Sequence, residues 1–324
     1  MSRQPSAMTD SIFRFSDREI LDARPAKLAV DPQRPYAYLV EPECSASGDV
    51  VSSATLFLTN RECPFRCLMC DLWRHTTDDP VPEGSIPSQI RYALARLPRA
   101  AQIKLYNSGN FFDSKAVAPG DHGEIAALVR PFEQVVVENH PRLCGDGCLR
   151  FRDLIDGRLE VALGLETVHE DLLAALNKRM TLDDFAHAAG FLIREDIDVR
   201  AFILLRPPFM SEEEGVGWAI RSIEFAFEAG VSCCSVIPTR AGNGIMEDLL
   251  RTGAFSPPDI RSLETVLESG LGMKRGRVFA DLWDAERFFR CADCGPARHD
   301  RLRRINLTQE VPPPVSCNCA TSGG

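Results

Sequence analysis

The sequence lacks the features that mark membrane, secreted and nucleic-acid-coating proteins. Its 324 residues contain no run near the roughly 18 consecutive apolar residues that a membrane span requires. Residues 1–15 hold no apolar stretch like that of a signal peptide, so we expect a cytoplasmic protein. Positive charge is also scarce, because 37 Lys and Arg face 46 Asp and Glu, which gives a net charge of −9. The chain is therefore not expected to coat nucleic acid non-specifically.

Cysteine is the residue type in unusual supply. Twelve thiols are too many for ordinary core positions, and a disulfide scaffold would need an oxidising compartment. Metal or redox chemistry is the remaining explanation, and the grouping of the positions favours it. The groups are Cys44; Cys63, Cys67 and Cys70; Cys144 and Cys148; Cys233 and Cys234; and Cys291, Cys294, Cys317 and Cys319.

Apolar runs alternate with helical patterns and predict a parallel α/β fold. Six predicted strands are near-continuously apolar, as expected for strands covered on both faces. They are residues 54–59, 103–106, 134–137, 159–165, 199–205 and 232–237. A six-unit partial barrel and a doubly wound open sheet both fit this pattern. In either fold we expect the chemistry at the carboxyl ends of the strands.

Capping signals predict where several helices begin. Ser211 and Glu214 form a capping box, and Thr181 with Asp184 resembles a second one. Ser88 is expected to start a helix before the second strand. Around this core we expect an N-terminal extension over residues 1–50 with a short edge strand at 36–40. The barrel would then cover residues 51–283, and a Cys-rich segment residues 284–324.

Three cysteines follow the first predicted strand in the pattern C-x-x-x-C-x-x-C. Cys63, Cys67 and Cys70 can surround one corner of an iron–sulfur cluster, which normally takes four cysteine ligands. Three ligands leave one iron open, as a catalytic zinc site keeps a position free. Two alternatives are three core cysteines on one helix face, which Pro64 disfavours, and a zinc site that includes His75.

This loop resembles the hallmark of the radical SAM superfamily. The resemblance implies a partial (β/α)6 barrel of the TIM type in which Cys63, Cys67 and Cys70 hold a [4Fe–4S] cluster. It implies that S-adenosylmethionine (SAM) chelates the open iron and is cleaved by one electron. The resulting 5′-deoxyadenosyl radical then abstracts a substrate hydrogen. Such an oxidoreductase takes electrons from a donor such as flavodoxin or ferredoxin. Met69 stands where the family usually has an aromatic residue near the adenine, and its sulfur can pack against a ring.

Polar residues at the later strand ends are similar to the SAM contacts of the family. They are Ser108, Gly109 and Asn110 after the second strand, Glu138 at the third, and Glu166 with Lys178 after the fourth. The resemblance assigns the first segment to the methionine amino group. The acid of the third strand can accept both ribose hydroxyls. The last two resemble a pair in the elongator catalytic subunit and methylthiotransferase branch, with the lysine near the SAM carboxylate. A turn, a capping carboxylate and a helix-terminal cation are the simpler alternatives.

Five short segments together are most similar to the radical SAM partner of archaeosine synthase, a tRNA-modifying lyase. They lie at residues 108–111, 138–141, 164–167, 176–178 and 206–209. The substrate stays open between tRNA, a small molecule and a peptide, and a methylthiotransferase-like reaction is an alternative. A non-catalytic iron–sulfur or zinc protein is the competing class. Arg206 and Arg240, after the fifth and sixth strands, can grip an anionic substrate or lie on the surface.

The last cysteines form a second candidate metal site. Cys291, Cys294, Cys317 and Cys319 have the pattern C-x-x-C…C-x-C, and two close pairs can enclose one metal. Zinc and a second iron–sulfur cluster both suit four thiolates. Free thiols on a tail are the alternative. No residue is assigned a catalytic role in hydrogen abstraction from the sequence.

Overall fold

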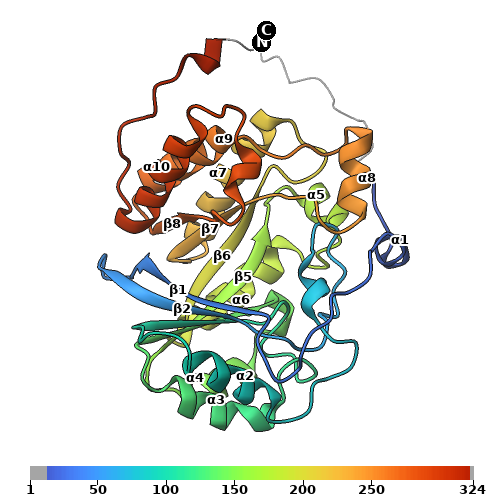
Figure 1. The fold of residues 1–324 in the computed structure, drawn as a ribbon, viewed down its shortest axis with the longest axis vertical. Coiled ribbons are helices and arrows are strands. Elements are labelled where there is room, and N and C mark those ends of the chain that lie inside the picture. Colours follow the sequence, from blue (N-terminus) through green and yellow to red (C-terminus); the bar gives the residue numbers. More distant parts are fainter. Residues whose placement is uncertain (1–12, 322–324) are drawn as a thin grey trace.

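A computed structural model describes residues 13–321 as one curled eight-stranded sheet with helices around it (Figure 1). Residues 1–12 of the predicted extension and 322–324 of the predicted C-terminal segment lie outside the described residues. The strands are β1 (Ala37–Cys44), β2 (Val50–Phe57), β3 (Gln102–Tyr106), β4 (Gln134–Asn139), β5 (Arg158–Glu166), β6 (Asp198–Leu205), β7 (Cys233–Pro238) and β8 (Arg277–Ala280).

The order of the strands confirms the partial barrel of the TIM type. Neighbours in the sheet are neighbours in the chain from β1 to β8, and every pair is parallel except β1 with β2. A doubly wound sheet reverses its strand order part-way along, so that alternative is wrong. The sheet ends at β1 and β8, and α10 (Gly295–Thr308) packs against both of these edge strands.

All six predicted strands are present, and two flank them. The edge strand predicted at 36–40 extends to Cys44, because Pro42 lies on an edge where its missing N–H is tolerated. The short strand β8 was not predicted, since its four residues begin with Arg277.

Helices cover the outer face of the sheet, and α2, α3 and α4 lie opposite α7, α9 and α10 in Figure 1. They are α2 (Ser85–Leu94), α3 (His122–Val129), α4 (Asp146–Arg152), α6 (Leu182–Arg194), α7 (Glu212–Glu228) and α9 (Ile260–Gly272). Both predicted capping boxes, at Ser211 and Thr181, are confirmed. The predicted start at Ser88 is wrong: α2 begins at Ser85 after Gly84, because Pro87 is tolerated in a first helical turn.

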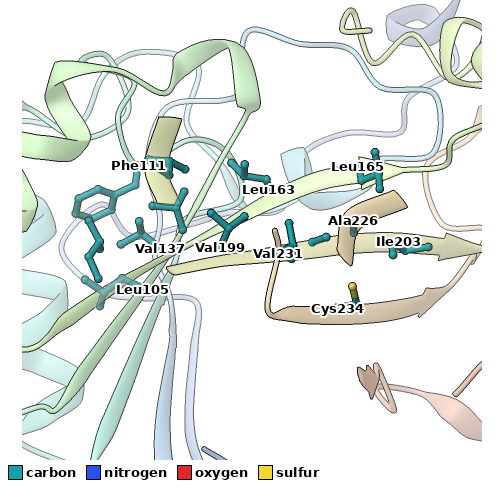
Figure 2. Packing of buried hydrophobic residues seen from close by; sticks show 14 of the residues in the cluster. Leu105, Phe111, Val137, Leu163, Leu165, Val199, Ile203, Ala226, Val231 and Cys234 are labelled. Atoms are coloured by element: carbon teal, nitrogen blue, oxygen red, sulfur yellow. The ribbon is translucent and has the colours of Figure 1, made fainter. Parts of the chain in front are cut away.

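Apolar side chains on the outer face of the strands form the main core. Leu105, Val137, Leu163 and Ile203 come from four successive parallel strands and are fully buried (Figure 2). Burying each side chain of this size stabilises the fold by about 1.5–3 kcal/mol. A second cluster joins α1 (Asp17–Asp22), α5 (Glu170–Ala175) and α8 (Ile245–Thr252) to Leu68.

The inner face of the sheet carries buried charges that the apolar pattern did not predict. Glu43 of β1 forms ion pairs with Lys104 of β3 and with Arg200 of β6, at 2.8 Å for the arginine. Arg200 also pairs with Glu160 at 2.5 Å. Burial by itself raises the pKa of Glu43, but the two cations hold it at about 2. Since Glu160 and Arg200 lie near the starts of their strands, this network occupies the end of the barrel away from the strand carboxyl ends.

Within residues 13–321, no helix combines the length and the apolarity that a membrane crossing requires.

Candidate functional site

The predicted cysteine motif lies in a loop, residues 58–77, that leaves the carboxyl end of β2. The loop is closed at its base, where the backbone N–H of Glu62 donates to the carbonyl of Thr77 at 2.9 Å. Residues 62–71 form no helix, so the interpretation of three cysteines on one helix face is wrong. We call this segment the cysteine loop.

Residues distant in the chain fix the backbone of the cysteine loop. Asn243, after β7, donates to the carbonyls of Leu68 at 2.7 Å and of Cys70 at 3.1 Å. Asn177, after α5, donates to the carbonyl of Arg66 at 2.8 Å. Neither asparagine was assigned a role from the sequence, although Asn177 lies in the 176–178 segment, and both lie just outside the ends of helices. Buried backbone carbonyls need partners, so these amides define the shape of the loop.

The three thiols are half-buried and free. Asn110 donates its side-chain N–H to the sulfur of Cys63 at 3.1 Å. Burial raises the pKa of all three thiols, to about 11 for Cys67, and the charge of Lys178 opposes that shift at Cys63 and Cys67. Thiols in this state ionise when a metal ion binds them.

His75, the alternative fourth ligand for zinc, stacks on another ring. Its imidazole lies 4.2 Å from the ring of Tyr36, centroid to centroid, with the planes 12° apart. Among the described residues, neither His75 nor the three loop thiols belong to a group of ligand atoms that converge on one ion, so the loop does not form a compact site for a single zinc.

The segment predicted to bind the methionine end of SAM lies against the cysteine loop. An ideal Cβ on Gly109 would lie 3.6 Å from the Cβ of Cys63, which is ordinary van der Waals contact, so this turn lies directly against the cysteine loop. Ser108 has a φ of 52°, and its hydroxyl lies 3.0 Å from that of Tyr36. Asn110 accepts a hydrogen bond from the backbone of His140 at 2.7 Å, which ties β3 to β4 beside the loop.

Glu138 at the end of β4 supports the same segment. Its Oε1 accepts the backbone N–H groups of Asn107 at 2.6 Å and of Gly109 at 3.3 Å. Burial raises the pKa of Glu138 to about 7, although these N–H groups favour its charged form. The carboxyl group therefore shapes the turn after β3.

Glu166 and Lys178 form a buried ion pair at the end of β5. Lys178 Nζ lies 2.6 Å from Glu166 Oε1, and the two side chains are 10% and 8% exposed. Glu166 has a φ of 65° at an irregularity in the pairing of β5 with β6. A Cβ at Gly164 would meet the ends of both side chains, so glycine leaves them room to meet. Charge balance within the pair keeps Lys178 protonated and raises its pKa despite burial.

His140 directly follows the end of β4 and links the cysteine loop to Lys178; it lies in the 138–141 segment singled out from the sequence, but no role was assigned to it there. Its ring stacks on Phe65 of the cysteine loop with centroids 3.8 Å apart, and its Nε2 lies 3.0 Å from the carbonyl of Lys178. Burial, with the nearby charge of Lys178, lowers the pKa of His140 to about 4. The imidazole is therefore neutral at physiological pH.

Several buried polar atoms at the ends of β2 and β3 have no partner among residues 13–321. They belong to the side chains of Thr59, Asn60 and Asn107. An unpartnered buried polar group costs about 1–3 kcal/mol, so such atoms favour the presence of a polar ligand. Three free thiols, a buried cation and unpartnered amides fit an iron–sulfur cluster with a polar cosubstrate.

The remaining predicted positions differ in their surroundings. Met69 packs against the second apolar cluster. Arg206 is paired with Glu212 at 2.5 Å, and Arg240 with Asp281 at 2.8 Å, so both arginines are neutralised by nearby acids.

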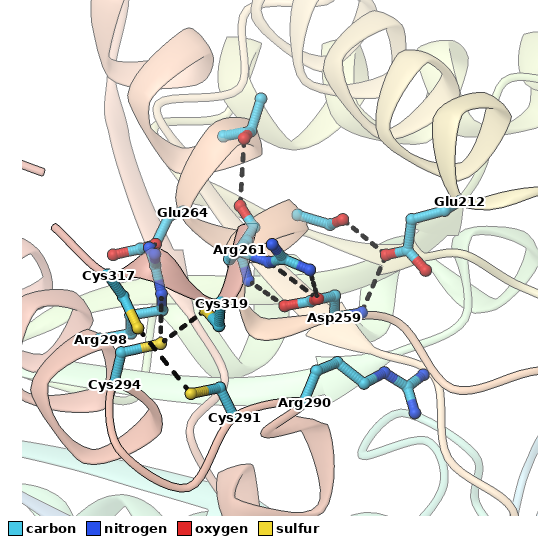
Figure 3. Close-up of polar contacts among 12 residues, drawn as sticks. Glu212, Asp259, Arg261, Glu264, Arg290, Cys291, Cys294, Arg298, Cys317 and Cys319 are labelled. Carbon is cyan, nitrogen blue, oxygen red and sulfur yellow. Dashed lines mark hydrogen bonds and ion pairs between the residues drawn. The ribbon is translucent and has the colours of Figure 1, made fainter. Parts of the chain in front are cut away.

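The C-terminal cysteines gather at one point far along the chain from the loop. Cys291 and Cys294 precede α10, and Cys317 and Cys319 lie in the segment that follows it. The sulfurs point toward one another (Figure 3), and all four lie within 4.8 Å of one another. We call this group the tail cluster and residues 310–321 the tail.

Comparison with known proteins identifies relatives. No protein-family model matches the chain. Archaeosine synthase subunit beta of Methanosarcina acetivorans is 25% identical over 282 residues, which cover 78% of this chain and 77% of that subunit. The subunit of the same name from Thermococcus kodakarensis is 28% identical over 62% of this chain and 65% of its own length. This chain is similar in sequence to archaeosine synthase subunit beta. The resemblance predicted from the sequence is confirmed.

This chain is also similar to other proteins. An uncharacterized protein of Methanocaldococcus jannaschii is 24% identical over 89% of this chain and 86% of its own length. Streptococcus suis SuiB bound to its precursor peptide SuiA aligns with a TM-score of 0.50 and 13% identity. That alignment covers 68% of this chain and 47% of SuiB, so this chain spans about half of the length of SuiB. The likeness to SuiB shows a shared fold.

Proposed function

We propose that the chain is a radical SAM enzyme. The observation that carries the proposal is the cysteine loop at the carboxyl end of β2, with Asn110 bonded to Cys63 and the Glu166–Lys178 pair beside it. Cys63, Cys67 and Cys70 would hold a [4Fe–4S] cluster and leave one iron for SAM. When bound, these two cofactors supply a 5′-deoxyadenosyl radical that abstracts hydrogen from a substrate.

The protein side chains would position the cofactors and neutralise their charge. Lys178 supplies a buried cation for the SAM carboxylate, and Glu166 keeps it protonated. Ser108, Gly109 and Asn110 form the turn proposed to face the methionine amino group. Glu138 bonds the backbone of that turn, so we propose that it positions the turn, and its contact with the ribose stays a prediction.

We propose a setting in tRNA modification on the ground of the named relatives. Two relatives are subunits of archaeosine synthase, and a subunit implies a partner chain. A reducing, cytoplasmic environment suits this role, because all twelve cysteines are free. The electron donor would be a flavodoxin or a ferredoxin.

The experiment is SAM cleavage by anaerobically reconstituted protein. We expect brown protein that forms 5′-deoxyadenosine from SAM under reductant, and at least a 100-fold loss of this product in Cys67→Ala. Cys144→Ala is the matched control, because this half-buried free thiol lies outside the cysteine loop. Equal cleavage by Cys67→Ala and wild type would contradict the proposal.

The substrate class is tested by isotope transfer. With deuterated tRNA as substrate, we expect deuterium in 5′-deoxyadenosine, and none with deuterated peptides or small-molecule extracts. Transfer from a peptide or small molecule alone would refute the tRNA setting and leave the radical SAM assignment intact.

A further inference from the structure

The tail cluster has the dimensions of a site for a single metal ion. The Cys291 and Cys317 sulfurs lie 3.9 Å apart, and the Cys294 and Cys319 sulfurs 3.6 Å apart. Four thiolates bound tetrahedrally to one ion, with metal–sulfur bonds of ~2.3 Å, have sulfurs separated by ~3.8 Å. The observed separations match that edge length.

The same dimensions are too small for an iron–sulfur cluster. In a [4Fe–4S] cluster each cysteine binds a different iron, and in a [2Fe–2S] cluster the cysteines bind two irons in pairs, so in both some cysteine sulfurs are separated by about 6 Å. All four sulfurs of the tail cluster lie within 4.8 Å of one another. The geometry thus separates two metal types that both suit the cysteine spacing in the sequence.

Arginines and their acidic partners surround the sulfurs, since Arg261 pairs with Asp259 and Arg298 with Glu264. Arg298 donates its Nε–H to the sulfur of Cys294 at 3.4 Å, and Arg261 and Arg290 line the small cavity beside the cluster (Figure 3). A divalent ion with four thiolates carries a charge of about −2, which nearby guanidinium groups offset. Hydrogen bonds from outer residues to ligand sulfurs are a regular part of metal sites.

The four ligands come from two segments, the start of α10 and the tail. Cys291 and Cys294 are fixed at the start of α10, while the tail forms no strand or α-helix in residues 310–321. The other contacts of the tail include bonds from Arg301 to the carbonyls of Pro312 and Pro313, at 2.6–3.1 Å. An ion bound by all four sulfurs would fasten the end of the tail to the base of α10.

We propose that Cys291, Cys294, Cys317 and Cys319 bind one zinc ion in a closed tetrahedral site that holds the tail against α9 and α10. With four protein ligands, the ion has no position for substrate, so the role is structural. The site is independent of the proposed radical chemistry, because none of its ligands comes from the cysteine loop.

The test uses the full chain with its loop cysteines removed. In Cys63→Ala/Cys67→Ala/Cys70→Ala, purified anaerobically and offered iron, sulfide and zinc, we expect one zinc per chain and no sulfide. Replacement by Co²⁺ should give the visible bands of tetrahedral tetrathiolate cobalt. Iron with an equal amount of sulfide in this variant, or no bound metal, would overturn the proposal.

The reciprocal variant provides the control. Cys317→Ser/Cys319→Ser should lose the zinc, keep the iron and sulfide of the cysteine loop, and be cut in the tail at least tenfold faster by a protease. If the triple variant does not fold, wild type decides: one zinc with four irons supports the proposal, and eight irons without zinc refute it. Wild-type protein that carries the zinc but cleaves no SAM would count against the proposed function alone.

Discussion

The cysteine loop and the tail cluster use the same side chain in opposite ways. The loop offers three thiols, and buried charges and unpartnered amides from other strand ends surround it. The tail cluster offers four thiols that converge on one point, and arginines surround it. Three ligands leave a metal position for a reactant, whereas four close it. The number of thiols and their convergence therefore distinguish a site proposed for chemistry from one proposed for structure.

Removing the buried cation of the loop site is expected to have the largest effect. Lys178→Met leaves Glu166 as a buried charge without its partner, so we expect a loss of about 3 kcal/mol in the free energy of unfolding. SAM cleavage should fall at least tenfold even at temperatures where the variant is folded. Chemical denaturation and 5′-deoxyadenosine formation measure the two effects.

The control for Lys178→Met is Arg91→Met. Arg91 pairs with Glu124 on the surface, where the two side chains are 47% and 50% exposed, so its loss should cost less than ~1 kcal/mol. If both variants lost the same small amount of unfolding free energy, the buried pair would contribute no more to stability than the surface pair.

A second variant changes a residue that holds the arginines around the tail cluster and leaves the four cysteines unchanged. Glu264 is 4% exposed and forms ion pairs with Arg298 and Arg301, which in turn bind carbonyls of the tail. In Glu264→Gln we expect a loss of about 2 kcal/mol and a ten- to hundredfold faster transfer of zinc to a chelator. SAM cleavage should stay within twofold of wild type.

The matched control is Glu268→Gln. Glu268 also pairs with Arg301, at 2.7 Å, but it is 41% exposed. We therefore expect a loss of less than ~1 kcal/mol in the free energy of unfolding and an unchanged rate of zinc transfer to the chelator. A large effect of Glu268→Gln together with none of Glu264→Gln would reverse the assignment.

The third variant tests a pH dependence of stability that arises at the loop site. Glu138 has a pKa of about 7 when folded, against 4.5 as its ordinary value. The folded protein therefore keeps a proton that the unfolded chain has released, and the free energy of unfolding falls as pH rises from 4.5 to 7. Glu138→Gln should lack this fall, which is on the order of 1–3 kcal/mol. Urea denaturation at pH 5 and pH 8 measures this fall. An equal change in the free energy of unfolding between the two pH values in both proteins would contradict the prediction.

The sequence predicted features that depend on neighbours in the chain. The six inner strands were found because β-branched runs buried on both faces differ from helical patterns, and the cysteine loop because its spacing is local. Lys104, Glu160 and Arg200 interrupt apolar strands, and their pairing across the barrel depends on curvature that no short segment encodes. Asn243 was missed for the same reason, since it reaches Leu68 across 175 positions of the chain.

The nearest-neighbour order of the strands has a consequence for how the chain folds. Each strand pairs with the one made just before it, so the sheet can grow from β1 toward β8 as the chain leaves the ribosome. The helix α10, which packs against both edge strands, is synthesised after all eight strands. We therefore expect completion of the barrel wall, and with it protection of the β1 and β8 backbones from hydrogen exchange, to be the last event of folding.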